Sequence, residues 1–333
     1  MAVLVTGGAG YIGSHTVYEL IGQGYDVAVA DNLSTGHIEA VHEKARFYNG
    51  DIRDRAFLGE LFRKEAVDGV IHFAASSLVG ESMADPLKYY NNNMYGTMVL
   101  LETMAGNGID KIVFSSSAAV YGEPESVPIR EEDRTAPLNT YGETKLAMER
   151  MMKWTSAAHG LRYVALRYFN ACGAHVSGCI GEDHCPETHL IPIILQAASG
   201  RREYVSVFGN DYDTPDGTCI RDYVHVTDLA RAHVLALEYL SGGGKSDVFN
   251  LGSGRGFSVA EIIEHTKRVT GCDFAVKYED RRLGDPAVLI ASGDKAERVL
   301  GWRPESSEIG RVLETAWEWH RNHPDGFGRR DDI

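Results

Sequence analysis

The stretch Thr6-Gly7-Gly8-Ala9-Gly10-Tyr11-Ile12-Gly13 decides the fold of this chain. It follows the apolar run Val3–Thr6 and opens a segment with helical periodicity. Gly7, Gly10 and Gly13 suit a tight turn in which the backbone approaches a pyrophosphate closely and the helix packs against the strand. The N-terminus of that helix offers N–H groups and a positive dipole end to phosphates. A plain strand–helix turn is the alternative, but the context on both sides favours a dinucleotide site.

Short apolar runs alternate with helical segments through the first half of the chain. This rhythm predicts an α/β fold, a doubly wound parallel sheet of the Rossmann type with helices on both faces, and a smaller α/β substrate-binding domain. The runs expected to form buried parallel strands are Val3–Thr6, Val27–Ala30, Arg46–Tyr48, Val70–Phe73, Ile112–Ser115, Tyr163–Leu166 and Val248–Leu251. Helices are expected near 12–23, 54–65, 87–106, 142–158, 190–199, 227–240, 258–269 and 307–322.

A change in amino-acid composition and loop length near residue 171 predicts the domain organisation. Loops lengthen there, and Gly, His, Asp and Pro become frequent through residue 222. We expect residues 1–170 to form the NAD-binding domain, with 223–252 returning to its sheet because Val248–Leu251 has the pattern of one more strand. Residues 171–222 and 253–325 are then expected to form the substrate-binding domain.

Composition excludes several classes of function. The net charge of −14 over 333 residues argues against nucleic acid or an anionic membrane as the main partner. Apolar runs fall short of the roughly 20 residues that a membrane span needs, and the N-terminal residues lack the pattern of an export signal. The five cysteines are odd in number and mostly scattered, which predicts a reducing, cytoplasmic location.

One stretch rich in cysteine and histidine could in principle form a metal site. Six such residues fall within eighteen positions, but they contain no Cys-x-x-Cys pair and match no common zinc spacing. We therefore expect a glycine-bearing loop and no metal. The six residues are Cys172, His175, Cys179, His184, Cys185 and His189.

Acidic residues after the second and third strands predict the choice of cofactor. Asp31 ends the second strand, eighteen residues after Gly13, where a carboxylate accepts hydrogen bonds from the adenosine ribose. It would repel a 2′-phosphate, and Asn32 rather than arginine follows, so NAD is favoured over NADP. Asp51, after the third strand, suits a contact with the adenine or, equally, a turn.

Tyr141 and Lys145 are the expected proton-transfer pair. They are four residues apart in a helical segment, so they share a face. A free tyrosine has a pKa of about 10, so its phenolate costs roughly 4 kcal/mol at pH 7, and neighbouring cations lower that cost. Ser117, at the end of the fifth strand, can hydrogen-bond the same substrate hydroxyl. Such a pair alone is more often ordinary helix surface, but beside a dinucleotide seat it predicts hydride transfer.

At this point the chain resembles the extended short-chain dehydrogenase/reductase family and, within it, the UDP-glucose 4-epimerases. The resemblance runs nearly from end to end. It is carried by Val5–Ser14, His72–Ala75, Val79–Ser82, Tyr89–Asn93, Phe114–Gly122, Arg167–Asn170, Phe208–Tyr212, Arg221–Val226 and Arg281–Asp285.

The resemblance implies NAD as cofactor, a UDP-sugar as substrate and a homodimer formed through the helices near 87–106 and 142–158. Tyr141 would take the proton of the sugar 4-hydroxyl while hydride leaves carbon 4, and the keto sugar would turn before the hydride returns. The implied cofactor-binding residues are Gly7, Gly10, Tyr11, Ile12, Gly13, Asp31, Asn32, Asp51, Ile52, Phe73, Ala74, Ala75, Asn92, Ser115, Tyr141, Lys145 and Tyr168. The implied substrate-binding residues are Ser117, Tyr141, Asn170, His189, Leu190, Phe208, Arg221, Tyr223, Arg282 and Asp285.

Differences between this chain and related branches of the family narrow the range of expected reactions. Related 4,6-dehydratases carry an acid just after the strand-five Ser/Thr, where this chain has Ala118 and Ala119, so simple epimerisation is favoured. Ser77 and His189 replace a lysine and an asparagine of some members, and Leu289 stands where side-chain size gates N-acetyl sugars. Two alternatives stay open: an epimerase of N-acetylhexosamine or uronate UDP-sugars, and a non-catalytic NAD-binding sensor.

Overall fold

A seven-stranded sheet forms the larger part of the chain in this computed structural model, which describes residues 2–282 and 285–328. The strand order is β10-β6-β5-β4-β1-β2-β3, and every pairing is parallel. The order reverses beside β1, and in such sheets the ligand crevice lies outside the carboxyl ends of the strands at this point, here between β1 and β4. The strands are β1 (Ala2–Thr6), β2 (Asp26–Asp31), β3 (Arg46–Asn49), β4 (Val67–His72), β5 (Lys111–Ser115), β6 (Arg162–Tyr168) and β10 (Asp247–Leu251).

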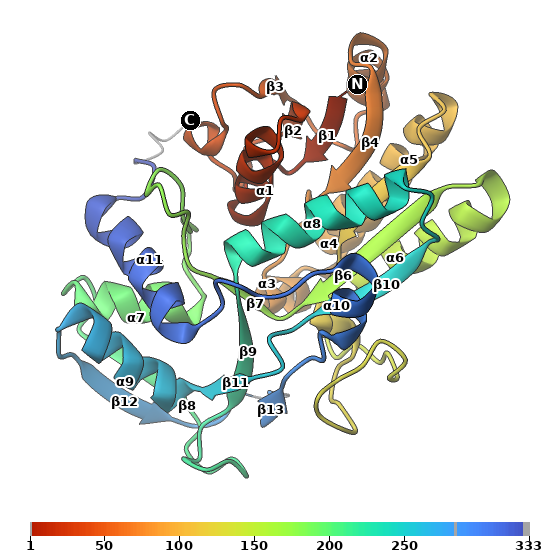
Figure 1. Cartoon of the computed structure of the whole chain (residues 1–333). Helices are drawn as coiled ribbons and strands as arrows, with labels where there is room; N and C mark the ends of the chain where they lie inside the picture. The colour runs from red at the N-terminus through yellow and green to blue at the C-terminus, as the bar shows by residue number, and fades with distance from the viewer. Residues whose placement is uncertain (1, 283–284, 329–333) are drawn as a thin grey trace.

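Helices cover both faces of this sheet, as predicted (Figure 1). The apolar faces of α1 (Tyr11–Gly22) and α8 (Val226–Ser241) pack on one side, and α2 (Arg55–Lys64), α5 (Gly96–Gly106) and α6 (Thr140–His159) pack on the other. Because each face is buried, central strands such as β1 and β5 are buried at every residue instead of alternating, whereas the edge strand β3 is only partly buried. The helix expected near 87–106 is α4 (Pro86–Tyr89), the π-helical turn η2 (Tyr90–Tyr95) and α5 in succession, and α3 (Val79–Ala84) precedes them.

A second core lies at the lower left of Figure 1. It is built around α7 (Leu190–Ala198), α9 (Val259–Thr270) and α11 (Ile309–Asn322), which were expected. Its strands were not expected: those of two or three residues are too short to show a period, and the alternation of β8 is a signal that the sequence analysis missed. One sheet contains β7 (Asn170–Cys172), β9 (Ile220–His225), β11 (Gly256–Ser258) and β13 (Val288–Leu289); the other pairs β8 (Tyr204–Phe208) with β12 (Ala275–Glu279).

Two segments cross between the cores. The predicted return of Val248–Leu251 is confirmed, since β10 pairs with β6. Residues 223–225, expected in the first sheet, instead complete β9 of the second part. Helix α10 (Asp294–Leu300) was not predicted; its Ala296 and Leu300 pack with Trp302 into the core of the first sheet, although the chain around them belongs to the second part. The division into two domains therefore stays a prediction, and the chain passes between the two cores more often than the sequence analysis expected.

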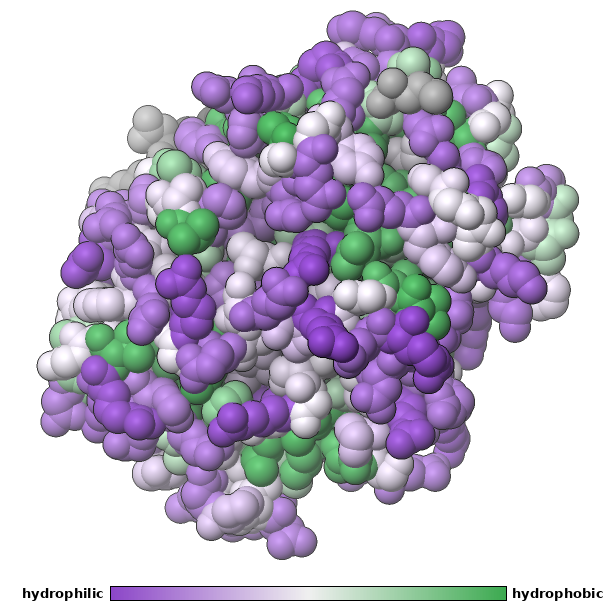
Figure 2. All heavy atoms as spheres, in the orientation of Figure 1, coloured by the Kyte–Doolittle hydropathy of each residue, from purple (hydrophilic) through white to green (hydrophobic). Residues whose placement is uncertain are grey.

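The surface agrees with the composition. Figure 2 shows a face on which hydrophilic residues predominate and hydrophobic residues form small separate groups. Among the helices of the described residues, none is both long and apolar enough to cross a membrane.

Candidate active site

The glycine turn joins β1 to α1 with almost no room for side chains. Gly7 has φ +76°, and a Cβ there would lie 2.5 Å from the backbone nitrogen of Ala74. A Cβ on Gly13 would lie 2.1 Å from the carbonyl oxygen of Gly7. Gly10 is the N-cap of α1 and has no capping side chain, so the first N–H groups of the helix face the turn. This bare backbone at a helix N-terminus fits a pyrophosphate.

Tyr11 and Ile12 stand in the first turn of α1 and tie the turn to its surroundings. The Tyr11 hydroxyl donates to the carbonyl oxygen of Gly173 at 2.5 Å, which links the turn to the second part of the chain. Ile12 packs against the core between α1 and the sheet. Both residues therefore hold the turn in place, whatever contact they also make with a cofactor.

Asp31 lies at the carboxyl end of β2, beside the glycine turn. Its Oδ2 accepts from the backbone N–H of Ala9 at 3.0 Å and its Oδ1 from that of Leu33 at 2.8 Å. These bonds aim the carboxylate at the edge of the crevice where a ribose would lie. Asn32 donates to Asp51 at 3.0 Å, and the Arg53 guanidinium holds the pKa of Asp51 down at about 2. Ile52 is buried beneath α5.

The end of β4 forms the opposite wall of the crevice. The backbone N–H groups of Phe73 and Ala74 both donate to the carbonyl oxygen of Thr6, and Ala75 continues the turn. Asn92, in η2, donates to the hydroxyl of Ser76 at 3.2 Å. The predicted cofactor residues of β1, β2 and β4 thus meet at one edge of the sheet.

Asn93 is a positioning residue that the sequence analysis missed. Its amide nitrogen donates to the Ser76 carbonyl at 3.0 Å and to the Thr144 hydroxyl at 3.1 Å, and its oxygen accepts from the Ser76 N–H at 2.8 Å. The residue is fully buried and joins the end of β4 to α6. The run Asn91-Asn92-Asn93 was the available signal, since polar residues inside a helix need partners.

Tyr141 and Lys145 lie in the first two turns of α6, as their spacing predicted. The Asn139 side chain caps the helix at the N–H of Gly142, and the N–H of Tyr141 donates to the buried Ser82 hydroxyl at 3.1 Å. The Lys145 ammonium lies 5.8 Å from the centre of the Tyr141 ring. Ser117, directly after β5, is near enough for its hydroxyl to hydrogen-bond the phenol.

Burial sets the charges of this group. It raises the pKa of Tyr141, against which the hydrogen bond from Ser117 acts in the lowering direction. It also lowers the pKa of Lys145 to about 7. Lys145 donates to the carbonyl oxygen of Ser115 at 2.7 Å, and the Ser115 hydroxyl bonds Tyr168 at 2.5 Å. A phenolate at Tyr141 would stabilise the ammonium form of Lys145, because opposite charges at this range favour each other.

A buried ion pair supports α6 from behind. Arg167 of β6 donates to both carboxylate oxygens of Glu149, at 2.9 and 2.6 Å, and neither side chain is more than 7% exposed. Ser116 donates to the same carboxylate, and Arg167 also donates to the Tyr121 hydroxyl, which donates to Asn250. The sequence analysis gave these residues no role, because their contacts join distant segments.

Glu149→Ala is expected to destabilise the protein by about 3–5 kcal/mol, because it leaves the Arg167 guanidinium buried without its partner. Urea unfolding would measure the change. Asp110→Ala is the matched control, since its pair with Arg162 is exposed and should contribute about 0–1 kcal/mol. Equal effects of the two substitutions would contradict a special role for the buried pair.

The predicted substrate residues gather at β7, β9 and the chain after β12. The Asn170 amide donates to the carbonyl oxygen of Asp222 at 2.9 Å, and Tyr223 is buried beside it. Arg221 forms an ion pair with Asp285. The Arg282 guanidinium stacks over the Phe208 ring, 4.0 Å from its centre. Of the motif around Arg282, Leu283 and Gly284 lie outside the described residues.

Of the remaining predicted substrate and specificity residues, Leu289 lies near the chain after Ser117, and His189 and Leu190 lie at the start of α7. Leu289 pairs with Arg221 in β13 and packs against the group containing Ala118 and Leu146, so it lies next to the chain that follows Ser117. His189 is the N-cap of α7 and Leu190 its first residue. The His189 Nδ1 faces Glu182 and its backbone N–H donates to Glu187, which leaves Nε2 for any substrate contact.

A dinucleotide-type crevice beside a Tyr–Lys pair places the chain in the class of α/β enzymes built for hydride transfer. Comparison with known proteins makes this specific. The model of the NAD dependent epimerase/dehydratase family matches residues 3–252, and the chain belongs to that family.

Individual relatives span the whole chain. A UDP-glucose 4-epimerase of Lacticaseibacillus casei is 57% identical over 331 residues, which cover 99% of this chain and 100% of the relative. A crystal structure of a UDP-glucose 4-epimerase superposes with a TM-score of 0.97 at 54% identity, covering 99% of this chain and 100% of the other. The Bifidobacterium longum enzyme, solved with NAD+ and UDP, has a TM-score of 0.92 at 41% identity, covering 98% and 100%.

Proposed function

We propose that this protein is an NAD-dependent UDP-glucose 4-epimerase, which interconverts UDP-galactose and UDP-glucose. The observation that carries the proposal is that Tyr141, Lys145 and Ser117 lie together at the carboxyl end of β5, in the sheet whose β1 ends in the glycine turn. Ala118 and Ala119 stand where an eliminating enzyme would need an acid. The similarity to epimerases along nearly the whole chain supports it.

The chain's own groups would move the proton and hold the nucleotide. Tyr141 takes the proton of the sugar 4-hydroxyl and later returns it, while Ser117 holds that oxygen by a hydrogen bond. Lys145 stabilises the phenolate through its charge. NAD, when bound, accepts the hydride from carbon 4 and gives it back. Inversion requires that the sugar turns while its UDP part stays anchored, so firm contacts must lie at the diphosphate and few at the sugar.

The proposed cofactor residues that follow β1, β2 and β4 lie at one edge of the sheet, which supports NAD as the cofactor. The bare turn at Gly7 and Gly13 suits the pyrophosphate, and Asp31 suits the ribose hydroxyls. The Asp51 carboxylate already accepts hydrogen bonds from Arg53 and from the Asn32 amide. We therefore propose that it positions these two residues near the adenine as well as contacting the adenine itself.

Arg282→Ala is expected to raise the KM for the UDP-sugar roughly 10- to 100-fold with little change in kcat, since a hydrogen bond to a charged group contributes about 1.5–3 kcal/mol. Initial rates over a range of UDP-galactose concentrations would measure the effect. Arg303→Ala is the control, because that arginine is 72% exposed and pairs only with Glu297 on the surface. An unchanged KM would remove Arg282 from the diphosphate site.

The test of the proposal is incubation of the purified protein with UDP-galactose, without added NAD, followed by assay for UDP-glucose. Conversion without net NADH is the expected result, because the hydride returns to the same sugar. Absence of conversion, even with added NAD, would contradict the proposal. Parallel assays with UDP-N-acetylglucosamine and UDP-glucuronate would test the two alternative substrate classes. Activity on the N-acetyl sugar depends on the space beside Leu289.

We also propose a homodimer formed by the helices α3 to α6. These helices pack on one another and expose large hydrophobic side chains, among them Met83 (60% exposed), Leu87 (75%) and Trp154 (71%). Such residues gathered on neighbouring helices indicate a protein–protein surface. The cytoplasmic location stays a prediction, which the free state of all five cysteines suits.

Leu87→Asp combined with Trp154→Glu is expected to shift the protein from dimer to monomer in sedimentation velocity, because charges would be buried without partners. Val176→Asp, an equally exposed position in the second part of the chain, should leave the dimer intact. A monomeric wild-type protein would refute the proposed assembly.

A further inference from the structure

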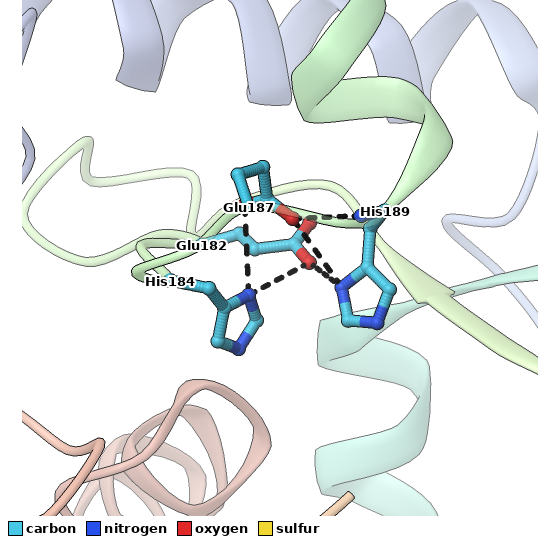
Figure 3. A group of neighbouring side chains, drawn as sticks. All are labelled: Glu182, His184, Glu187 and His189. Atoms are coloured by element: carbon cyan, nitrogen blue, oxygen red, sulfur yellow. Dashed lines mark hydrogen bonds and ion pairs between the residues drawn. The ribbon is translucent and has the colours of Figure 1, made fainter. Parts of the chain in front are cut away.

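The loop before α7 brings two glutamates and two histidines together at one point (Figure 3). One ligand atom from each of Glu182, His184, Glu187 and His189 lies within 4.8 Å of all the others. Their spacing is Glu-x-His-x-x-Glu-x-His. The sequence analysis considered only cysteines and histidines here and expected no metal; the structure leaves Cys179 and Cys185 exposed and supplies carboxylates instead.

The separations of these atoms suit a four-coordinate ion. In a tetrahedral zinc site with metal–ligand distances near 2.1 Å, neighbouring donor atoms lie roughly 3.3–3.6 Å apart. His184 Nδ1 lies 3.4 Å from Glu182 Oε1 and 3.6 Å from Glu187 Oε2, and His189 Nδ1 lies 3.8 Å from Glu187 Oε1. A shorter separation, 2.5 Å between His189 Nδ1 and Glu182 Oε1, is a hydrogen bond that would open around an ion, and every pair of ligand atoms lies within 4.8 Å.

A second observation points to a ligand. His184 Nδ1 is buried and faces the cluster, where its partners are carboxylate oxygens of Glu182 and Glu187 at 3.4 and 3.6 Å, which is long for a hydrogen bond. Glu182 and Glu187 are only 4% and 6% exposed, so their charges are held away from water. Buried carboxylates are paired or bind metals, and a buried nitrogen lone pair requires a partner as well.

We propose that Glu182, His184, Glu187 and His189 bind one zinc ion. Two imidazoles and two carboxylates are ligands that zinc accepts, and four protein ligands are typical of a structural rather than a catalytic site. The histidines bind through Nδ1 after zinc displaces the protons that they share with the glutamates, Glu182 binds through Oε1, and Glu187 offers one oxygen toward each histidine.

The place of the cluster in the fold indicates what the ion would do. The Glu182 carbonyl accepts from the Trp319 indole of α11 at 3.2 Å, and the His184 ring meets the ring of Tyr11 edge-on in the first turn of α1. Helix α7 begins directly after His189. The ion would therefore fix the start of α7 and the loop before it against the glycine turn of the first part.

The experiment measures metal in tag-free protein, by inductively coupled plasma mass spectrometry after gel filtration, and zinc affinity by competition with a chromophoric chelator. We expect about one zinc per chain in the wild type. His184→Gln and Glu187→Gln should bind zinc at least about 10- to 100-fold more weakly, the loss that removal of even an outer-shell partner causes. His184→Cys should retain zinc, because a thiolate is also a zinc ligand. The shorter cysteine side chain can reach the ion because Nδ1, which it replaces, is the ring nitrogen nearer the backbone.

His159→Gln is the matched control, because His159 is exposed in the last turn of α6 and far from the cluster in sequence. It should bind zinc as the wild type does. Failure of the wild type to bind one equivalent of zinc would overturn the proposal, as would wild-type affinity in His184→Gln. One equivalent of a different metal, with zinc excluded, would overturn the assignment to zinc. The wild-type titration decides the matter even if a variant fails to fold.

A second readout connects the site to substrate binding and rests on the proposed function. Chelation should lower the melting temperature of the wild type, restored by zinc, and should raise the KM for UDP-galactose more than it lowers kcat, because His189 and Leu190 are predicted substrate residues. If the protein binds zinc but converts no UDP-galactose, the proposed function fails and the metal site stands. If it converts UDP-galactose without binding zinc, only the metal site fails.

Discussion

Tyr141→Phe is expected to lower kcat by about 10²- to 10⁴-fold, the contribution typical of a positioned general acid–base group. The phenylalanine ring fills the same space in the first turn of α6, but it can neither take nor return the proton of the 4-hydroxyl. NAD should stay bound, because the glycine turn and Asp31 are untouched. Initial rates with UDP-galactose and the NAD released on denaturation give the two measurements.

Tyr239→Phe is the matched control for this substitution. Tyr239 lies in α8, and its hydroxyl only accepts from the N–H of Lys245 at 3.1 Å. Its loss should leave turnover unchanged. Wild-type turnover in Tyr141→Phe would exclude Tyr141 as the acid–base group and return attention to the non-catalytic sensor.

Lys145→Met is expected to shift the pH dependence of kcat to higher pH. The active base is the deprotonated phenol, and an adjacent cation moves the pKa of an acid by roughly 1 to 3. Without the ammonium the pKa of Tyr141, already raised by burial, rises further, so the phenolate fraction at pH 7 and the turnover fall roughly 10- to 1000-fold. Turnover should recover as the pH rises toward 10.

A pH–rate profile of the wild type and the variant between pH 6 and 10 would measure this shift. Because burial lowers the pKa of Lys145 to about 7, the charge of the wild-type lysine depends on nearby negative groups: Glu149 already raises this pKa, and a phenolate at Tyr141 would raise it further. Lys153→Met, at an exposed position of the same helix, should keep the wild-type profile. A parallel profile in Lys145→Met, lower at every pH by one factor, would show that Lys145 acts only by holding Ser115 in place.

Much of the fold could be predicted because its signals are local. Each strand of the large sheet is a short apolar run, and each of the longer helices carries its period and its end signals, as in the Ser258–Glu261 capping box that opens α9. The small strands β7, β11 and β13 could not be predicted, since two or three residues do not show a period. Helix α10 was missed because its seven residues are mostly charged and only Ala296 and Leu300 are buried, so its apolar face is too short to show a helical period.

The candidate site divides in the same way. The spacing of Tyr141 and Lys145 on one helix and the position of Asp31 after β2 are properties of single segments. The contacts of Asn93 with Ser76 and Thr144, and of Arg167 with Glu149, join positions 17 to 51 residues apart. Nothing in either segment alone predicts such a partner.

The sequence by itself determined the strands and long helices of the large sheet, the glycine turn and the proton-transfer pair, because backbone conformation and helical spacing depend on neighbouring residues. Only the tertiary structure decided which walls face the crevice, which buried charges support α6, and how Glu182, His184, Glu187 and His189 converge. Although these four lie within eight positions, their side chains meet because the loop is held between Tyr11 of α1 and Trp319 of α11. Packing across segments fixes the direction of a side chain, and spacing along a loop does not.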